Sequence, residues 1–161
     1  IRHRLLSHYQ NITFNLIAPH ELELSEEIEA FLLSQGHLIK KHDRLEEGIK
    51  DVEIIYVTRT QEERFTSQED ALRYKGLFRL NQSIYTENCA PNTVIMHPLP
   101  RDSRQDAQEL DTDLNENPNL AIFRQADNGV IVRMALFALV LGVAGEVHNH
   151  SQPVTWYSSR R

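Results

Sequence analysis

Hydrophobic and polar residues alternate along this chain with two different spacings, and each spacing predicts its own kind of element. Apolar residues at every second position, or short unbroken apolar runs, are typical of β-strands. On this basis four strands are predicted, over residues 12–17, 38–39, 52–57 and 94–96. Between these runs, apolar residues stand three and four positions apart, which is typical of helices that bury one face.

Capping residues mark the expected ends of several helices. Ser25 is a good N-cap for a helix that Gly36 ends as a C′ residue. Asp43 and Asn81 are expected N-caps of two further helices. Helices are thus predicted near residues 5–11, 25–36, 43–49 and 81–89, and a last one over 130–141, with 123–129 leading into it. The polar stretches 59–76, 102–119 and 142–161 are predicted to be irregular, solvated segments, the first of them mobile and the last poorly ordered.

Strands that alternate with helices predict an α/β fold with a parallel sheet and right-handed crossovers. We therefore expect a three-layer Rossmann-like arrangement with helices on both faces of the sheet. A G-x-G-x-x-G loop is absent, which disfavours a dinucleotide-binding domain.

Composition narrows the class of protein. A chain of 161 residues, 40% hydrophobic and 25% charged, is long enough for one globular core. The net charge of −6 disfavours nucleic acid as a partner. Cys89 is the only cysteine and is interpreted as a semi-buried, unreactive thiol in a reducing, cytoplasmic compartment. No apolar run of about 20 residues predicts a membrane span, and no signal peptide is visible. The chain opens in mid-pattern, which we interpret as a fragment of a longer protein.

Two polar motifs follow predicted strands. Arg59 and Gln61 come after the third strand, at the edge of a parallel sheet where α/β proteins bind ligands. A guanidinium at that place suits a carboxylate, and Glu63 could orient it. A set of solvated surface ion pairs is the alternative interpretation.

The second motif is the Leu-Pro loop, residues 97–100, which follows the fourth strand. Its Leu99-Pro100 bond is one where a cis isomer is accessible, and we expect a cis bond to aim backbone carbonyls into the space beyond the strand. By itself this string is also compatible with an ordinary rigid turn. We expect His97 to make a structural hydrogen bond and not to transfer protons.

Three motifs in this order resemble one enzyme family. They are Thr58-Arg59-x-Gln61-x-Glu63-Arg64, His97-Pro98-Leu99-Pro100-Arg101, and Phe123-Arg124-Gln125-Ala126-x-Asn128-Gly129-x-x-x-Arg133-x-Ala135-Leu136. Together they resemble the C-terminal, aspartate-binding half of the aspartate carbamoyltransferases, over nearly everything from His3 to Leu141. The resemblance implies the C-terminal half of the aspartate/ornithine carbamoyltransferase fold.

The resemblance also implies roles for individual residues. Arg59 would hold a carboxylate of L-aspartate, with Gln61 in the same pocket. The backbone of Pro98, Leu99 and Pro100 would contact the carbamoyl group of carbamoyl phosphate. The second-shell and domain-closure residues would be Glu63, Arg64 and Arg133. The implied reaction is attack of the aspartate amine on the carbamoyl carbon, with no cofactor, no metal and no covalent intermediate.

The chain departs from a complete member of that family. The Ser-Thr-Arg-Thr phosphate loop, the lysine loop and the His-Pro-x-Gln segment of the N-terminal carbamoyl-phosphate domain do not occur here. We therefore expect half of a site, inactive alone, from a parent that is a homotrimer. The expected division is an aspartate-binding domain over 1–121, a helix over 122–142 that crosses to the missing domain, and a polar tail over 143–161. Without that domain, the apolar helix is expected to expose its surface or to find another partner.

Three alternatives stay open at this point. The half-site could have become a non-catalytic structural or regulatory module. An ornithine carbamoyltransferase is disfavoured, because Thr58-Arg59-x-Gln61 and the Leu-Pro loop suit a dicarboxylic substrate. His148 and His150 with Glu146 are weak evidence for a metal site, and the acidic run from Glu109 to Glu116 is interpreted as a solvated loop that lacks the spacing of a calcium site.

Overall fold

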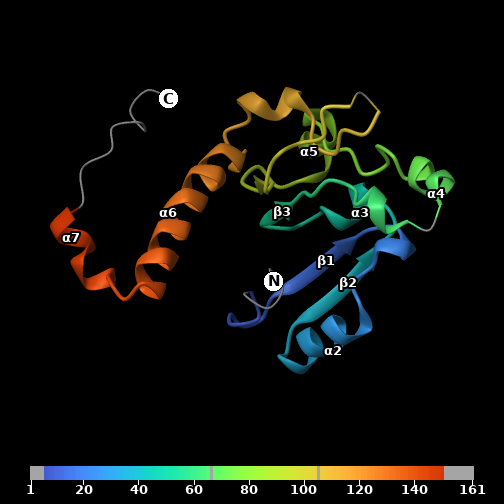
Figure 1. The fold of residues 1–161 in the computed structure, drawn as a ribbon. Coiled ribbons are helices and arrows are strands. Elements are labelled where there is room, and N and C mark those ends of the chain that lie inside the picture. The colour runs from blue at the N-terminus through green and yellow to red at the C-terminus, as the bar shows by residue number, and fades with distance from the viewer. Residues whose placement is uncertain (1–5, 66, 105, 151–161) are drawn as a thin grey trace. The chain divides into compact units, whose positions relative to one another are not determined.

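The computed structural model describes residues 6–65, 67–104 and 106–150 and shows an α/β protein with parallel strands (Figure 1). Strand β1 (Thr13–Ile17) pairs in parallel with β2 (Leu38–His42), and β3 (Ile54–Tyr56) pairs in parallel with β4 (Val94–Met96). The predicted fold class is confirmed. Within the described residues, however, the strands form two separate two-stranded ladders and not one four-stranded ladder.

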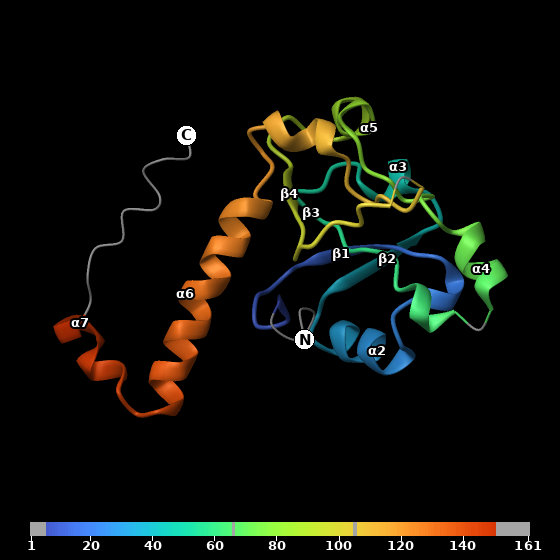
Figure 2. The ribbon, with the colours of Figure 1, turned by 45° about the horizontal axis from the view of Figure 1, so that its top comes forward.

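Helices connect the strands in chain order. They are η1 (His20–Leu22), α2 (Glu26–Ser34), α3 (Leu45–Gly48), η2 (Glu62–Arg64), α4 (Gln68–Arg73), α5 (Gln82–Asn88), η3 (Thr112–Glu116), α6 (Ile122–Val140), η4 (Ala144–Glu146) and α7 (Val147–His150). Helix α2 contacts β2, and the short α3 contacts β1, β2 and α5 (Figures 1 and 2). The helices thus separate strands that pair in parallel, as a crossover connection requires.

Three of the four predicted caps stand at the expected helix ends and one is wrong. Asn81 caps α5, because its side-chain Oδ1 accepts a hydrogen bond from the backbone N–H of Ile84 at 2.9 Å. Gly36 follows α2 with a positive φ of 80°, the conformation that favours glycine after a helix. Helix α3 begins after Arg44 and not after Asp43, and Ser25 occupies the N-cap position of α2 without a side-chain capping bond.

Several boundaries differ from the predictions. Helix α6 begins at Ile122, eight residues before the predicted start at Val130, because Gly129 is accommodated inside the helix at a modest cost. Helices η2 and α4 lie in the polar segment 59–76, and η4 and α7 lie in the predicted polar tail. The stretch 7–11 forms turns and not a helix. The rest of the tail, residues 151–161, and residues 1–5 lie outside the described ranges.

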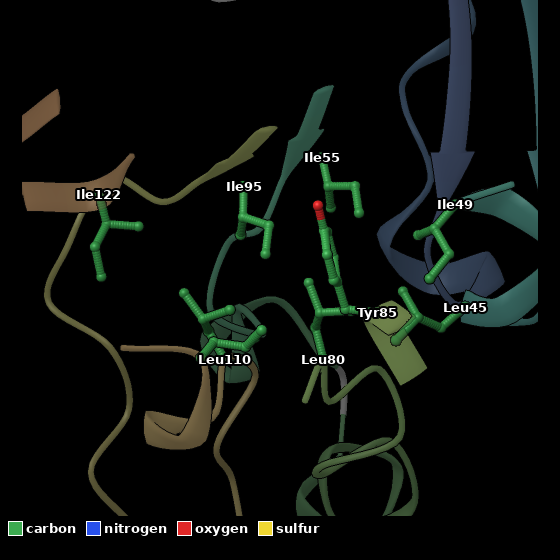
Figure 3. Packing of buried hydrophobic residues seen from close by; sticks show 9 residues of the cluster. Leu45, Ile49, Ile55, Leu80, Tyr85, Ile95, Leu110 and Ile122 are labelled. Carbon is green, nitrogen blue, oxygen red and sulfur yellow. The ribbon is translucent and has the colours of Figure 1, made fainter. Parts of the chain in front are cut away.

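One hydrophobic cluster holds the first part of the chain together. Figure 3 shows its members gathered from α3, β3, α5 and β4, from the segments before α5 and after β4, and from the first residue of α6. The buried residues of the cluster are Leu45, Ile49, Ile55, Leu80, Tyr85, Ile95, Leu110, Leu114 and Ile122. Burial of nine such side chains is the dominant favourable contribution to folding of this region.

The acidic segment 102–119 is part of this core, so its prediction as a solvated loop is wrong. Leu110 and Leu114 are fully buried, and Leu110 forms a parallel bridge with Leu80. Ile95 of β4 forms a second bridge with Leu120. The sequence did not predict this packing because the segment has few apolar residues, although those few are buried.

The chain divides after Ile122 into two compact units, Ile1–Ile122 and Phe123–Arg161. The second unit contains most of α6, whose large apolar side chains are mainly exposed in this single chain. The exposed ones in α6 are Phe123, Ile131, Val132, Met134, Leu136, Phe137, Leu139 and Val140. Among the described residues, no helix is both long enough and apolar enough to cross a membrane.

The two helical glycines Gly129 and Gly48 lead to a paired prediction. A Cβ at Gly129 meets no atom within 4 Å, so Gly129→Ala should stabilise α6 by about 0.5–1 kcal/mol. A Cβ at Gly48 overlaps the side chain of Ile17, so Gly48→Ala should lower the free energy of unfolding by about 1–3 kcal/mol. Thermal and urea unfolding followed by far-ultraviolet circular dichroism measures both. A destabilising Gly129→Ala or a neutral Gly48→Ala would contradict the packing described here.

Candidate functional site

A hollow of about 190 Å³ lies beyond the carboxyl ends of β1 and β3. Residues from four segments line it: Ile17, Ala18, Pro19 and Leu22 after β1; Thr58, Arg59, Thr60 and Gln61 after β3; Gly76 and Phe78; and Ala107, Gln108 and Glu109. This is the place where open α/β proteins bind ligands. Its small size suits a small polar molecule better than a large cofactor.

Arg59 and Gln61, predicted from the sequence, both lie on the wall of this hollow, in the arginine loop of residues 58–65. Both side chains are solvent-exposed, so a dissolved ligand can reach them. The Oε1 atom of Gln61 accepts a hydrogen bond from Nη1 of Arg64 at 3.1 Å. The wall therefore presents a guanidinium and an amide, together with the hydroxyl-bearing residues Thr58 and Thr60.

The Leu-Pro loop begins at the same edge of the sheet. Tyr56 and Met96 are paired in the parallel register, and the N–H of Val57 donates to the carbonyl of Met96 at 2.9 Å. The segments that follow β3 and β4 thus leave the sheet side by side. The Leu99-Pro100 bond is cis, as predicted, and Leu99 has a φ of 54°, a left-handed conformation that is uncommon for leucine.

The first residue of the Leu-Pro loop, His97, forms a buried histidine–carboxylate pair with Glu109. His97 and Glu109 have side chains only 1% and 4% exposed, and Nε2 of His97 lies 2.7 Å from Oε1 of Glu109. The other ring nitrogen of His97, Nδ1, accepts a hydrogen bond from the N–H of Leu99 at 2.8 Å. The prediction of a structural hydrogen bond at His97 is confirmed.

The carboxylate of Glu109 is held in its charged form. Burial alone raises the pKa of Glu109, but hydrogen bonds from His97 and from backbone amides outweigh this effect and lower the pKa below its ordinary value. One of those amides is the N–H of Asp102, 3.1 Å from Oε1. Glu109 therefore serves as an acceptor for two groups of the neighbouring loop.

A partly exposed ionic cluster joins the arginine loop to the residues after the Leu-Pro loop. The guanidinium of Arg104 bonds to both carboxylate oxygens of Glu62, at 2.6 and 3.1 Å, and to both of Asp102, at 2.6–3.2 Å. Hydrogen bonds from Arg104 lower the pKa of Asp102 to about 2, and the positive charge of Arg59 acts in the same direction. One arginine thus connects two loops that are forty residues apart in the sequence.

The structure leaves the other predicted charged residues, Glu63, Arg64 and Arg133, without a described place in this hollow. Arg64 is exposed on η2 and contacts Gln61, whereas the side chain of Glu63 lies outside what the structure describes. Arg133 lies on α6, in the second unit, so its predicted proximity to Arg59 stays a prediction. Sequence reasoning missed Arg104 and took Glu109 for a solvated acid, because their partners are distant and no local pattern marks them.

The described residues contain no group of three or more side chains that could hold a metal ion. The acidic run is engaged otherwise: Asp111 pairs with Arg79, and Asp113 accepts from the N–H of Gln82. The side chain of His150, half of the weak histidine motif, is not among those described. Burial raises the pKa of the Cys89 thiol to about 11, which agrees with the expected unreactive cysteine.

Comparison with known proteins identifies the relatives of this chain. It is 59% identical over 157 residues to the aspartate carbamoyltransferase catalytic subunit of Saccharophagus degradans, a match that covers 98% of this chain and 47% of that protein. The same subunit of Dichelobacter nodosus is 46% identical, over 93% of this chain and 43% of its own length. The chain thus spans about half the length of these curated relatives.

Solved structures agree with this result. The catalytic subunit of aspartate transcarbamoylase from M. jannaschii superposes with a TM-score of 0.73 at 29% identity, over 89% of this chain and 44% of that one. Aspartate transcarbamoylase from Trypanosoma cruzi, in complex with phosphate, gives a TM-score of 0.70 at 26% identity, over 83% and 44%.

The family model of the aspartate/ornithine carbamoyltransferase Asp/Orn binding domain matches residues 3–140, almost the whole chain. The position of the hollow at the carboxyl ends of the strands and the presence of the Leu-Pro loop are consistent with this match. The chain belongs to the aspartate/ornithine carbamoyltransferase family and corresponds to its Asp/Orn binding domain.

Proposed function

We propose that this chain supplies the L-aspartate-binding half of a site that transfers a carbamoyl group from carbamoyl phosphate to aspartate. The observation that carries the proposal is the position of Arg59 and Gln61 on the wall of a small hollow, at the edge where the Leu-Pro loop also leaves the sheet. The relatives are named aspartate carbamoyltransferases, and structures of the Trypanosoma cruzi enzyme hold carbamoyl aspartate with phosphate, or N-(phosphonacetyl)-L-aspartic acid.

In the proposed reaction, the amine of aspartate attacks the carbonyl carbon of carbamoyl phosphate. A carbon–nitrogen bond forms, the bond from that carbon to the phosphate oxygen breaks, and phosphate leaves with the electron pair while the amine loses a proton. Arg59 binds a carboxylate of aspartate through two parallel charge-assisted hydrogen bonds, and Gln61 offers an amide to the same molecule. Backbone groups of Pro98, Leu99 and Pro100 contact the carbamoyl group.

This assignment makes orientation the main contribution of the chain. Holding two reactants in attack geometry replaces a bimolecular encounter by a unimolecular one, and fixed donors stabilise the charge that develops. The phosphate is bound by a partner domain, and the parent is a cytoplasmic homotrimer of pyrimidine biosynthesis. Glu63, Arg64 and Arg133 act in orienting Arg59 and in closing the two domains.

The family contains ornithine as well as aspartate enzymes, and the exposed guanidinium of Arg59 in the hollow favours aspartate. The side chain of ornithine ends in a cation, which a neighbouring guanidinium repels, whereas the second carboxylate of aspartate is attracted by Arg59. A non-catalytic module derived from this domain is the competing proposal, and the first two experiments below separate it from the enzyme.

The first prediction concerns the isolated chain. The 161-residue protein should form no carbamoyl aspartate from carbamoyl phosphate and L-aspartate, because it supplies one wall of the site. A chimera that joins the unmatched part of the Saccharophagus degradans relative to residue 1 should be active, since the two chains are 59% identical over the matched region. Product formation is measured by a colorimetric ureido assay. Turnover by the isolated chain, or an inactive folded chimera, would contradict the proposal.

The second prediction concerns Arg59. In the active chimera, Arg59→Ala should lower kcat/KM for L-aspartate by about 10- to 150-fold, the equivalent of about 1.5–3 kcal/mol for a lost charge-assisted contact. The matched control is Arg44→Ala, an exposed arginine outside the hollow, which should leave kcat/KM unchanged. Equal effects of the two substitutions would remove Arg59 from the site.

The third prediction concerns the ionic cluster around Arg104. Because the pKa of Asp102 is lowered from 3.8 to about 2 in the folded state, its ionic contribution is complete above pH 3.8 and is lost as the pH falls toward 2. Asp102→Asn should therefore reduce the loss of unfolding free energy between pH 5 and pH 3, as measured by urea denaturation. Asp51→Asn, at an exposed carboxylate outside the cluster, serves as the control and should keep the wild-type loss. An unchanged acid loss in Asp102→Asn would contradict the cluster.

A further inference from the structure

The buried pair of His97 and Glu109 is used by no step of the proposed reaction, although His97 is the first residue of the Leu-Pro loop. The two side chains come from segments twelve residues apart and are almost completely withdrawn from water. Removing a carboxylate from water is costly unless its partners replace the lost hydration. Apolar side chains would fill the same volume with a smaller desolvation cost, which indicates that this pair has a role other than packing.

The hydrogen bonds determine which nitrogen of His97 carries the proton. The N–H of Leu99 can only donate, so Nδ1 of His97, 2.8 Å away, must offer its lone pair. The proton of the neutral ring is therefore on Nε2, from which it is donated to Oε1 of Glu109 at 2.7 Å. The carboxylate thus selects the tautomer that allows His97 to hold the backbone of Leu99.

The same carboxylate also bonds to the far end of the loop. The N–H of Asp102 donates to Oε1 and Oε2 of Glu109, at 3.1 and 3.3 Å. Glu109 therefore bridges the residue that begins the Leu-Pro loop and the residue just after Arg101. Between these two anchors stands Leu99 with its φ of 54°, a conformation that persists in a leucine only where the surroundings impose it.

Glu109 is connected to both loops of the candidate site. With Ala107 and Gln108, it lines the same hollow as Arg59 and Gln61 of the arginine loop, and it bonds to His97 of the Leu-Pro loop. Any shift of the backbone at residue 109 would therefore move the Leu-Pro loop relative to the arginine loop. A displacement of about 1 Å between reacting groups can lower a rate by about 100-fold.

We propose that Glu109 is a positioning residue, which acts through the tautomer of His97 and the N–H of Asp102 to hold the backbone of Leu99 where it meets the carbamoyl group. This inference rests on the proposed function for its catalytic consequence. Its structural part, the control of His97 by Glu109, can be observed in the isolated chain without any substrate.

The structural part is tested by nitrogen-15 NMR of the 161-residue chain. The ring of His97 should show a protonated Nε2 and an unprotonated Nδ1 at neutral pH, and the Leu99 amide should be protected from hydrogen exchange. In Glu109→Ala, Leu99 exchange should accelerate about tenfold or more, the equivalent of one lost hydrogen bond of about 1.5 kcal/mol. A wild-type ring protonated on Nδ1, or on both nitrogens, overturns the inference even if no variant folds.

Two further variants separate positioning from general stability. In Glu109→Gln, the amide Oε1 can still accept from both His97 and Asp102, so the His97 signature and the Leu99 protection should be retained. Tyr85→Phe removes a different buried hydrogen bond, from Tyr85 to the carbonyl of Thr93 at 2.7 Å, and should lower stability without changing the His97 ring. A His97 signature that is altered equally by Tyr85→Phe and Glu109→Ala would overturn the inference.

The catalytic part is tested in the active chimera. Glu109→Ala should lower kcat by about 10- to 100-fold, with a smaller change in KM for aspartate because Arg59 is unchanged. Glu109→Gln should retain most of the wild-type kcat. Tyr85→Phe should leave kcat unchanged. An unchanged kcat in a folded Glu109→Ala chimera overturns the inference and leaves the proposed function intact. An inactive wild-type chimera, together with the expected His97 signature, overturns the proposed function instead.

Discussion

The parallel pairing of β3 with β4 is the constraint on which the rest of the site depends. Because Tyr56 is in register with Met96, the chain leaves both strands at the same edge of the sheet. Antiparallel pairing would have sent the arginine loop and the Leu-Pro loop to opposite edges. Each strand contributes only three residues, so this register is maintained chiefly by the packing of Ile55 and Ile95 in the common core.

The core also includes the acidic segment 102–119, although few of its residues are apolar. Leu110, Leu114 and Ile122 bury their side chains against the strands, while the charged residues between them face outward or bond to loops. The segment therefore packs into the core through its leucines and carries Glu109 into contact with His97 of the Leu-Pro loop. Packing and candidate chemistry thus depend on the same stretch of chain.

The polar contacts at the site form two groups that differ in their exposure to solvent. The cluster of Arg104 with Glu62 and Asp102 is partly exposed, and screening by water weakens each of its ion pairs. The pair of His97 and Glu109 is buried, where every donor and acceptor must be satisfied. The Arg104 cluster therefore connects two loops weakly, whereas the His97–Glu109 pair holds one backbone conformation.

Much of the fold was predictable because its signals are local. Alternating apolar residues marked the strands, Asn81 marked a helix start, and Gly36 marked a helix end. The start of α6 was misplaced because a glycine in a helix costs only about 1 kcal/mol, which the rest of the helix easily outweighs. Asp43 was taken for a cap because its residue type is a statistical preference and not a geometric requirement.

At the site, the sequence by itself determined which residues follow the strands and which bond could be cis. Arg59, Gln61 and the Leu-Pro loop were found this way, because strand ends and X-Pro bonds are features of neighbouring residues. Only the tertiary structure decided that Glu109 is buried, that it selects a tautomer of His97, and that Arg104 joins two loops. Those properties depend on groups brought together from distant positions, and one sequence carries no local record of such contacts.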